Sequence, residues 1–206
     1  MKKKILTWGS ALLVTGLTTI YSQAAERGMY LTIDGGANWI PNFDASFATP
    51  GGPEAEAEID LETGFRGGVA LGYNFNRFLG AELESGFVYN EAKDVDAWLG
   101  QVPFLANIIF RYENTSRLVP FVGAGAGGVA AILDLQEGDA DESDSDIVFA
   151  WQFQGGVRYK FSEQSSFGVV YKYMGVDAPE FSLGASDQDF DMYHNHAVLA
   201  SFNFAF

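Results

Sequence analysis

The carboxylates that could bind a metal ion are concentrated in one stretch, LDLQEGDADESDSD, at residues 133–146. Clustered carboxylates suit hard divalent cations, so Asp139, Asp141, Asp144 and Asp146 are candidate cation ligands. The stretch lacks the central glycine and the distal glutamate of an EF-hand. A second interpretation, a solvated loop without regular structure, fits the same composition.

Two histidines, His194 and His196, share one face of an alternating segment. Histidine can act in hydrolysis or bind a metal, but no nearby serine fits the role of nucleophile and no further ligands can be placed. We therefore interpret the pair as polar residues at a membrane interface. The glycine-rich stretch GAGAGG at 123–128 lacks the Lys-Ser/Thr of a nucleotide loop, which favours a strand.

A third set of charges occurs at every second position of apolar segments, and such period-two alternation predicts β-strands. The set comprises Arg66, Glu82, Glu84, Arg111, Arg158 and Lys172. Most of the strands are near the length that crosses a bilayer at a tilt. Eight strands are predicted, at 29–39, 65–75, 79–89, 104–112, 120–128, 149–160, 167–174 and 195–206.

The connections between these strands alternate strictly between short and long. Tight polar turns are predicted around 74–77, 113–117 and 162–165, and long polar intervals at 40–62, 90–100, 132–147 and 175–192. One face of the strands is apolar and the other carries the charges, which is the inverse of a soluble sandwich. The pattern predicts an all-β fold, an eight-stranded antiparallel up-and-down transmembrane barrel with short periplasmic turns and long outer loops.

In such a narrow barrel the six charges would lie in the lumen, where side chains fill the interior. Buried carboxylates need cationic partners, so a structural network of Glu82 and Glu84 with the four basic residues is the favoured interpretation. A gated pore for a small ion or a proton path is the alternative.

The N-terminal segment indicates export, and the composition excludes several kinds of site and partner. Residues 1–24 combine Lys2, Lys3 and Lys4 with an apolar run and small residues, which predicts a cleavable signal peptide rather than a membrane anchor and leaves 25–206 as the barrel. The 206 residues contain no cysteine, so disulfides and thiolate metal sites are excluded. A net charge of -15 argues against nucleic acid as a partner.

The chain resembles the OmpA-like/opacity-type eight-stranded outer-membrane barrels, without their peptidoglycan-binding domain. The resemblance rests on YLTIDGGANW, FRGGVALGYNF, LGAELESGF, VPFVGAGAGG and the terminal FNFAF. It implies a monomer in the bacterial outer membrane, among lipid and lipopolysaccharide. It also implies that Phe206, supported by Phe202 and Phe204, is an assembly signal read by the barrel-assembly machinery.

Function is less constrained than location, because a fold does not determine an activity. Of the 27 acidic residues, 21 fall in the four long intervals, where Lys93 is the one basic residue. Loops on a rigid scaffold often carry function. We expect a non-enzymatic protein without a cofactor that contributes to envelope integrity or surface interaction through acidic extracellular loops. The alternatives are a narrow pore or small-solute transporter and, less favoured, a lipid-modifying enzyme.

Overall fold

The computed structural model describes residues 27–48, 55–93, 97–137, 140–183 and 186–206. The predicted signal peptide lies outside these ranges. All regular structure within them is β-strand. The described residues include no helix with the length and apolar character needed to cross a membrane.

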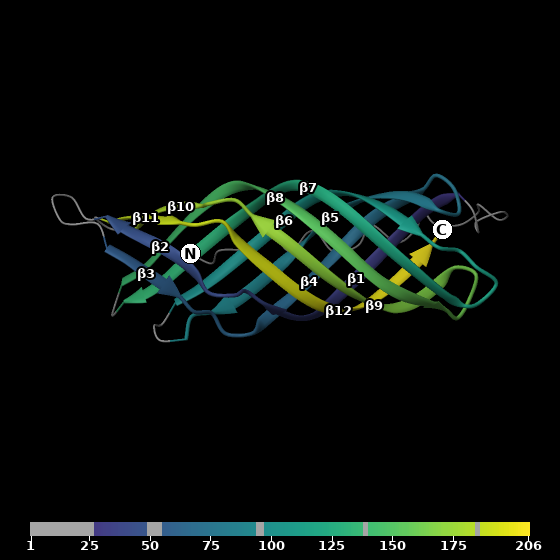
Figure 1. Ribbon diagram of the computed structural model, residues 1–206, viewed down its shortest axis with the longest axis horizontal. Coiled ribbons are helices and arrows are strands. Elements are labelled where there is room, and N and C mark those ends of the chain that lie inside the picture. The colour runs from purple at the N-terminus through teal and green to yellow at the C-terminus, as the bar shows by residue number, and fades with distance from the viewer. Residues whose placement is uncertain (1–26, 49–54, 94–96, 138–139, 184–185) are drawn as a thin grey trace, which may run out of the picture.

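Eight strands close into an antiparallel barrel, as predicted (Figure 1). Around the wall they follow the order β1, β12, β9, β8, β7, β6, β5, β4 and back to β1. The barrel strands are β1 (Gly28–Trp39), β4 (Gly64–Asn74), β5 (Leu79–Glu91), β6 (Ala97–Arg111), β7 (Leu118–Glu137), β8 (Ala140–Lys160), β9 (Ser165–Val176) and β12 (Tyr193–Ala205).

The first and last strands seal the barrel. β1 pairs with β12 from Tyr30↔Ala205 to Trp39↔His196, and the main-chain N–H of Phe206 donates to the carbonyl of Met29 at 2.9 Å. Closure leaves no free sheet edge in the wall, so every strand has a hydrogen-bonding neighbour on both sides.

Side-chain exposure follows the strand alternation. Outward residues such as Leu83 and Phe104 are 69% and 60% exposed, whereas inward residues such as Arg66 and Glu84 are 2% and 5% exposed. Large apolar side chains on the outside of a closed sheet are stable when lipid, rather than water, surrounds the barrel.

Three strands, β6, β7 and β8, run far beyond their predicted ends on one side of the barrel. Short turns connect the strands at the turn end, between β4 and β5, β6 and β7, and β8 and β9. At the opposite end, here called the loop end, β7 reaches Glu137 and β8 begins at Ala140. An irregular loop over 132–147 was therefore the wrong interpretation, because main-chain pairing such as Leu133↔Asp144 continues through the acidic residues.

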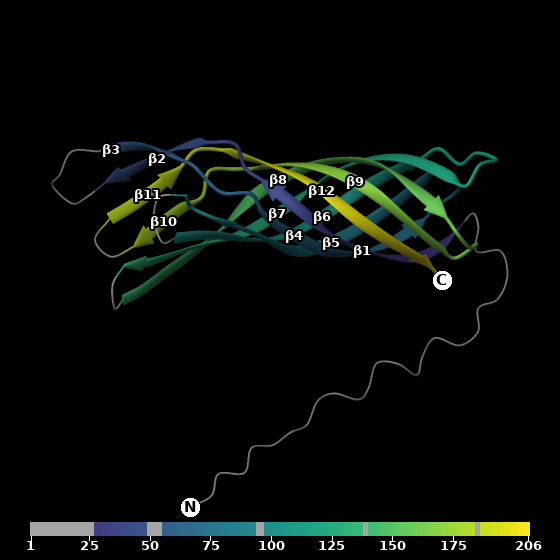
Figure 2. The same ribbon diagram turned by 90° about the horizontal axis from the view of Figure 1, so that it is seen from below.

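Two other long intervals, 40–62 and 175–192, also contain strands that the sequence did not predict. β2 (Phe43–Ala48), β3 (Ala55–Ile59), β10 (Glu180–Leu183) and β11 (Ser186–Phe190) form a second sheet in the order β10-β11-β2-β3. Figure 2 shows this loop sheet and the β7–β8 hairpin at the same end of the molecule. These four strands are short and contain several carboxylates, so their alternation was not recognised in the sequence.

Candidate functional site

The side chains that fill the lumen form the most densely connected polar site of the described residues. Its centre is Glu84 on β5, whose carboxylate accepts hydrogen bonds from four strands. The donors are Arg66 Nη2 at 3.0 Å, Lys172 Nζ at 2.6 Å, Asn107 Nδ2 at 2.9 Å and Gln152 Nε2 at 3.0 Å. A buried carboxylate is stable only with such compensation.

Several of these bonds cross the lumen from one wall to the other. Lys172 on β9 reaches Glu84 on β5, and Arg66 on β4 donates to Gln152 Oε1 on β8 at 2.5 Å. In the order of the wall, both pairs of strands lie diametrically opposite each other. Lys172 also contacts Asp34 Oδ2 at 2.8 Å, so a single lysine joins two carboxylates.

A second group of charges surrounds Glu82, two positions towards the turn end on β5. Tyr30 donates its hydroxyl to Glu82 Oε1 at 2.9 Å, and Arg158 Nη2 lies 3.7 Å from the same oxygen. The Arg158 guanidinium stacks over the Phe121 ring at 4.3 Å. Tyr30 fits because Gly72 lies beneath its ring, where an added Cβ would come within 2.2 Å of Tyr30 Cζ.

Five of the six predicted lumen charges thus meet in two groups. The sixth, Arg111, lies apart and donates to Asn74 Oδ1 and to the carbonyl of Asn76, the latter at 2.9 Å. Sequence reasoning left Tyr30 out of the network, although it shares the inward face of β1 with Asp34. That shared face was the available signal.

The lumen is less polar towards the loop end than the alternation predicted. Next to the charged groups, on the side of the loop end, two pairs of amide side chains are hydrogen-bonded, Gln101 with Asn195 at 3.0 Å and Asn38 with Asn90 at 2.6 Å. Beyond them lies an apolar cluster of buried residues from the barrel and the loop segments. It includes Ile40, Phe43, Leu61, Leu99, Val129, Leu133, Met174 and Tyr193.

The loop sheet contributes to this cluster. Phe43 of β2 stacks on Tyr193 of β12 with ring centroids 5.1 Å apart. A smaller apolar cluster of Ile109, Phe121, Val170, Ala197 and Leu199 also faces inward. Apolar and charged side chains together fill the interior, so the predicted polar inner face describes only part of the lumen.

Of the four candidate cation ligands, the structure describes the side chain of Asp146 alone. The side chains of Asp139, Asp141 and Asp144 lie outside the described residues, and Asp146 accepts the N–H of Ile147 at 2.7 Å. Among the residues that the structure describes, no three His, Cys, Asp or Glu side chains come together as metal ligands.

The two histidines lie on the outer wall near the loop end, among aromatic rings. The Tyr171 hydroxyl contacts His196 Nδ1 at 2.7 Å, and Trp39 stacks on the same imidazole with centroids 5.5 Å apart. Tyr173 contacts both imidazoles, with centroids 5.3 Å from His194 and 5.0 Å from His196. Such a cluster resembles the aromatic belts at membrane interfaces.

The terminal phenylalanines lie at the turn end of β12. Phe202 is 40% exposed and contacts Phe161 with ring centroids 6.2 Å apart. Phe204 and Phe206 meet edge to face at 5.3 Å. Their role in assembly stays a prediction.

A closed eight-stranded barrel with an apolar exterior and charges bridged inside defines the class: a small transmembrane barrel of the bacterial outer membrane. A family model supports this conclusion. Residues 10–206 match the outer membrane protein beta-barrel domain, and the chain belongs to that family.

Solved structures show the same fold at low sequence identity. Neisserial surface protein A is 18% identical with a TM-score of 0.56, covering 87% of this chain and 97% of its own. OprG from Pseudomonas aeruginosa is 14% identical with a TM-score of 0.60, covering 89% and 99%. The outer membrane protease OmpT from Escherichia coli is 7% identical with a TM-score of 0.51, covering 91% and 99%. No curated protein matches the chain in sequence.

Proposed function

We propose that the protein is a non-conducting, non-enzymatic outer-membrane barrel that contributes to envelope integrity or surface contact through its acidic extracellular loops. The observation that carries this proposal is the bridged lumen. Ion pairs and amide pairs join opposite walls, and an apolar cluster lies beyond them. Eight strands leave an interior that side chains can fill.

The filled interior argues against a pore as the main function. A hydrated ion on its way through would have to break the contacts of Glu84 with Arg66 and Lys172, whose side chains are almost fully buried. Breaking such a buried group uncovers unpaired charges at a high cost. The apolar cluster around Leu99 and Tyr193 offers an ion no polar contacts to replace its water.

The loop end carries most of the negative charge of the protein. The long intervals carry 21 of the 27 acidic residues, and they form the loop sheet and the β7–β8 hairpin. A dense negative charge suits contact with divalent cations that bridge to lipopolysaccharide phosphates, or with a basic partner. The barrel would act as the scaffold that holds this surface outside the membrane.

An enzyme is the less favoured interpretation. OmpT, which shares the fold, is a protease, but fold likeness alone transfers no activity. In the described part of this chain, His194 and His196 contact aromatic rings and the Tyr171 hydroxyl. Turnover of lipid A by hydrolysis or acyl transfer in a purified sample would revive the enzymatic interpretation.

Planar-bilayer recording of the purified barrel tests the proposal directly. We expect no steady single-channel current from the natural sequence. A triple variant, Arg66→Ala with Glu84→Ala and Lys172→Ala, removes three bridging side chains, and a current from this variant alone would show that the bridges keep the lumen closed. A steady current from the natural protein would replace the proposal with the narrow pore. Deletion of the gene should sensitise cells to detergents and chelators, and insensitivity to both would remove the integrity role.

A further inference from the structure

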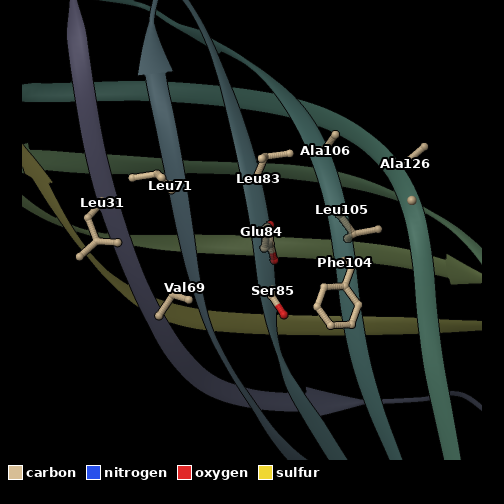
Figure 3. A pocket seen from close by; sticks show the side chains of 11 residues that line it. Leu31, Val69, Leu71, Leu83, Glu84, Ser85, Phe104, Leu105, Ala106 and Ala126 are labelled. Atoms are coloured by element: carbon tan, nitrogen blue, oxygen red, sulfur yellow. The ribbon is translucent and has the colours of Figure 1, made fainter. Parts of the chain in front are cut away.

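The lipid-facing wall carries an apolar groove of about 470 Å³ that the proposed function does not use. Figure 3 shows its lining on adjacent strands, from Leu31 of β1 across to Ala126 of β7. Leu83 and Phe104 project from β5 and β6 in the middle of this lining, whereas Ser85, Ala106 and Ala126 are small. The hollow exists because small outward residues on β5, β6 and β7 lie between large ones.

The depth of the groove places it in the hydrocarbon region. Ser85 is near the middle of β5, and its partners Val69 and Phe104 are near the middles of β4 and β6. Strand centres of a transmembrane barrel lie far from both headgroup layers. The groove is also continuous with the exposed apolar side chains that face lipid, such as Leu71 and Leu83. An acyl chain is therefore the occupant that its surroundings supply.

The β5–β6 ladder is interrupted beside the groove. Pairing runs from Leu79↔Phe110 to Ser85↔Phe104 and resumes at Val88↔Gln101. The Arg111 N–H donates to the carbonyl of Phe78, so these two residues are a hydrogen-bonded pair of the ladder. In an antiparallel ladder every second pair is of this kind, and in the register of β5 and β6 Gly86 opposite Pro103 is one of them. Proline has no N–H, so the Gly86 carbonyl lacks the donor that the ladder would supply.

Ser85 adds a second polar group at the same place. It is the only residue of the lining whose polar side chain points outward, since Glu84 faces the lumen. A hydroxyl and an unpaired carbonyl are costly in hydrocarbon unless a partner satisfies them. A hydroxyl group on a lipid chain can both donate to a carbonyl and accept from a serine.

We propose that this groove binds one acyl chain of a membrane lipid, and that Ser85 and the Gly86 carbonyl favour a chain with a hydroxyl group along its length. A second copy of the protein is a poorer fit, because the projecting Leu83 and Phe104 side chains would meet its outer wall first. A flexible chain can enter the hollow between them and gain contacts on several sides, whereas a chain on a convex wall gains them on one side.

Photolabelling of the folded mature barrel in phosphatidylcholine vesicles tests the site. The probe is stearate with a mid-chain diazirine, and adducts are mapped by mass spectrometry. We expect labelling of Leu83 and Phe104 about tenfold above that of Val169 on the other side of the barrel, the ratio that ~1.4 kcal/mol of extra packing gives. Equal labelling of all three residues would overturn the site.

Variants separate packing from hydrogen bonding. Ala106→Leu and Ala126→Leu fill the groove and should abolish the excess labelling, whereas the matched control Ala200→Leu, outward on β12, should retain it. Stearate with a mid-chain hydroxyl should compete about fivefold better than plain stearate, as one hydrogen bond predicts. Ser85→Ala leaves the Gly86 carbonyl as the one partner, so it should weaken this preference and keep the labelling. A preference that Ser85→Ala leaves unchanged would overturn the role of Ser85. Heat-modifiable migration on gels shows that each variant is folded.

Discussion

Replacing Glu84 with glutamine tests the bridged lumen most directly. The change keeps the size of the side chain and removes its charge. Lys172 retains Asp34 as a partner at 2.8 Å, but Arg66, whose ion pair is with Glu84 at 3.0 Å, is left as a buried cation without a carboxylate. Breaking a buried pair from one side costs about 3–5 kcal/mol. We expect Glu84→Gln to lower the free energy of unfolding by that amount.

A double variant shows whether the cost comes from the charge. Arg66→Met in the Glu84→Gln background restores charge balance, because Lys172 and Asp34 still pair. The double variant should therefore recover most of the stability, with a coupling energy of at least about 2 kcal/mol. Glu163→Gln, exposed in the β8–β9 turn, is the control and should change stability by less than about 0.5 kcal/mol.

The assay is equilibrium unfolding in urea of the barrel refolded into vesicles, followed by tryptophan fluorescence and by migration of unheated samples on gels. The m value should stay constant, so that a shifted midpoint reports stability. A Glu84→Gln variant as stable as Glu163→Gln, or single-variant costs that simply add in the double variant, would refute the reasoning.

Three further predictions follow from the same contacts. Gly72→Ala places a Cβ within 2.2 Å of the Tyr30 ring and should destabilise the barrel by about 1–3 kcal/mol in the urea assay. Gly128→Ala, whose nearest neighbours are 3.7 Å away, is its control and should be nearly neutral. Phe206→Asp puts a charge beside Met29 at the seam and should reduce the folded fraction in the outer membrane, measured by heat-modifiable migration; normal surface levels would refute the assembly role. If the loops bind cations, a chelator should raise their protease sensitivity, and added magnesium should reverse it.

The sequence predicts the turn end of the barrel well and the loop end poorly. The strand predicted from Leu79 begins there in the structure, because NFNR is a tight polar turn that breaks the alternation. At the other end, Val129, Ala131 and Leu133 continue the inward face of β7. Their continuation was hidden because the acidic residues that follow were taken as a loop. Main-chain pairing in a hairpin tolerates carboxylates wherever these reach water.

The lumen shows the same division between what alternation determines and what closure determines. Alternation places Arg66 and Glu84 on the inner face, since each lies two residues from other inward positions. It does not reveal which side chains face each other across the barrel, because that depends on the order and stagger of all eight strands. Lys172 and Asp34 lie 138 residues apart, and they meet in the closed barrel, where β12 pairs with both β1 and β9.

The charges of the molecule divide into two sets with different consequences. Within the lumen, three carboxylates pair with three cations: Asp34, Glu82 and Glu84 with Arg66, Arg158 and Lys172. These charges cancel, so they leave little field outside the wall. The net charge of -15 must therefore come from the long intervals at the loop end, where the acidic residues outnumber Lys93. A partner attracted by charge would meet that end of the barrel, whereas the buried charges stabilise the wall that holds it.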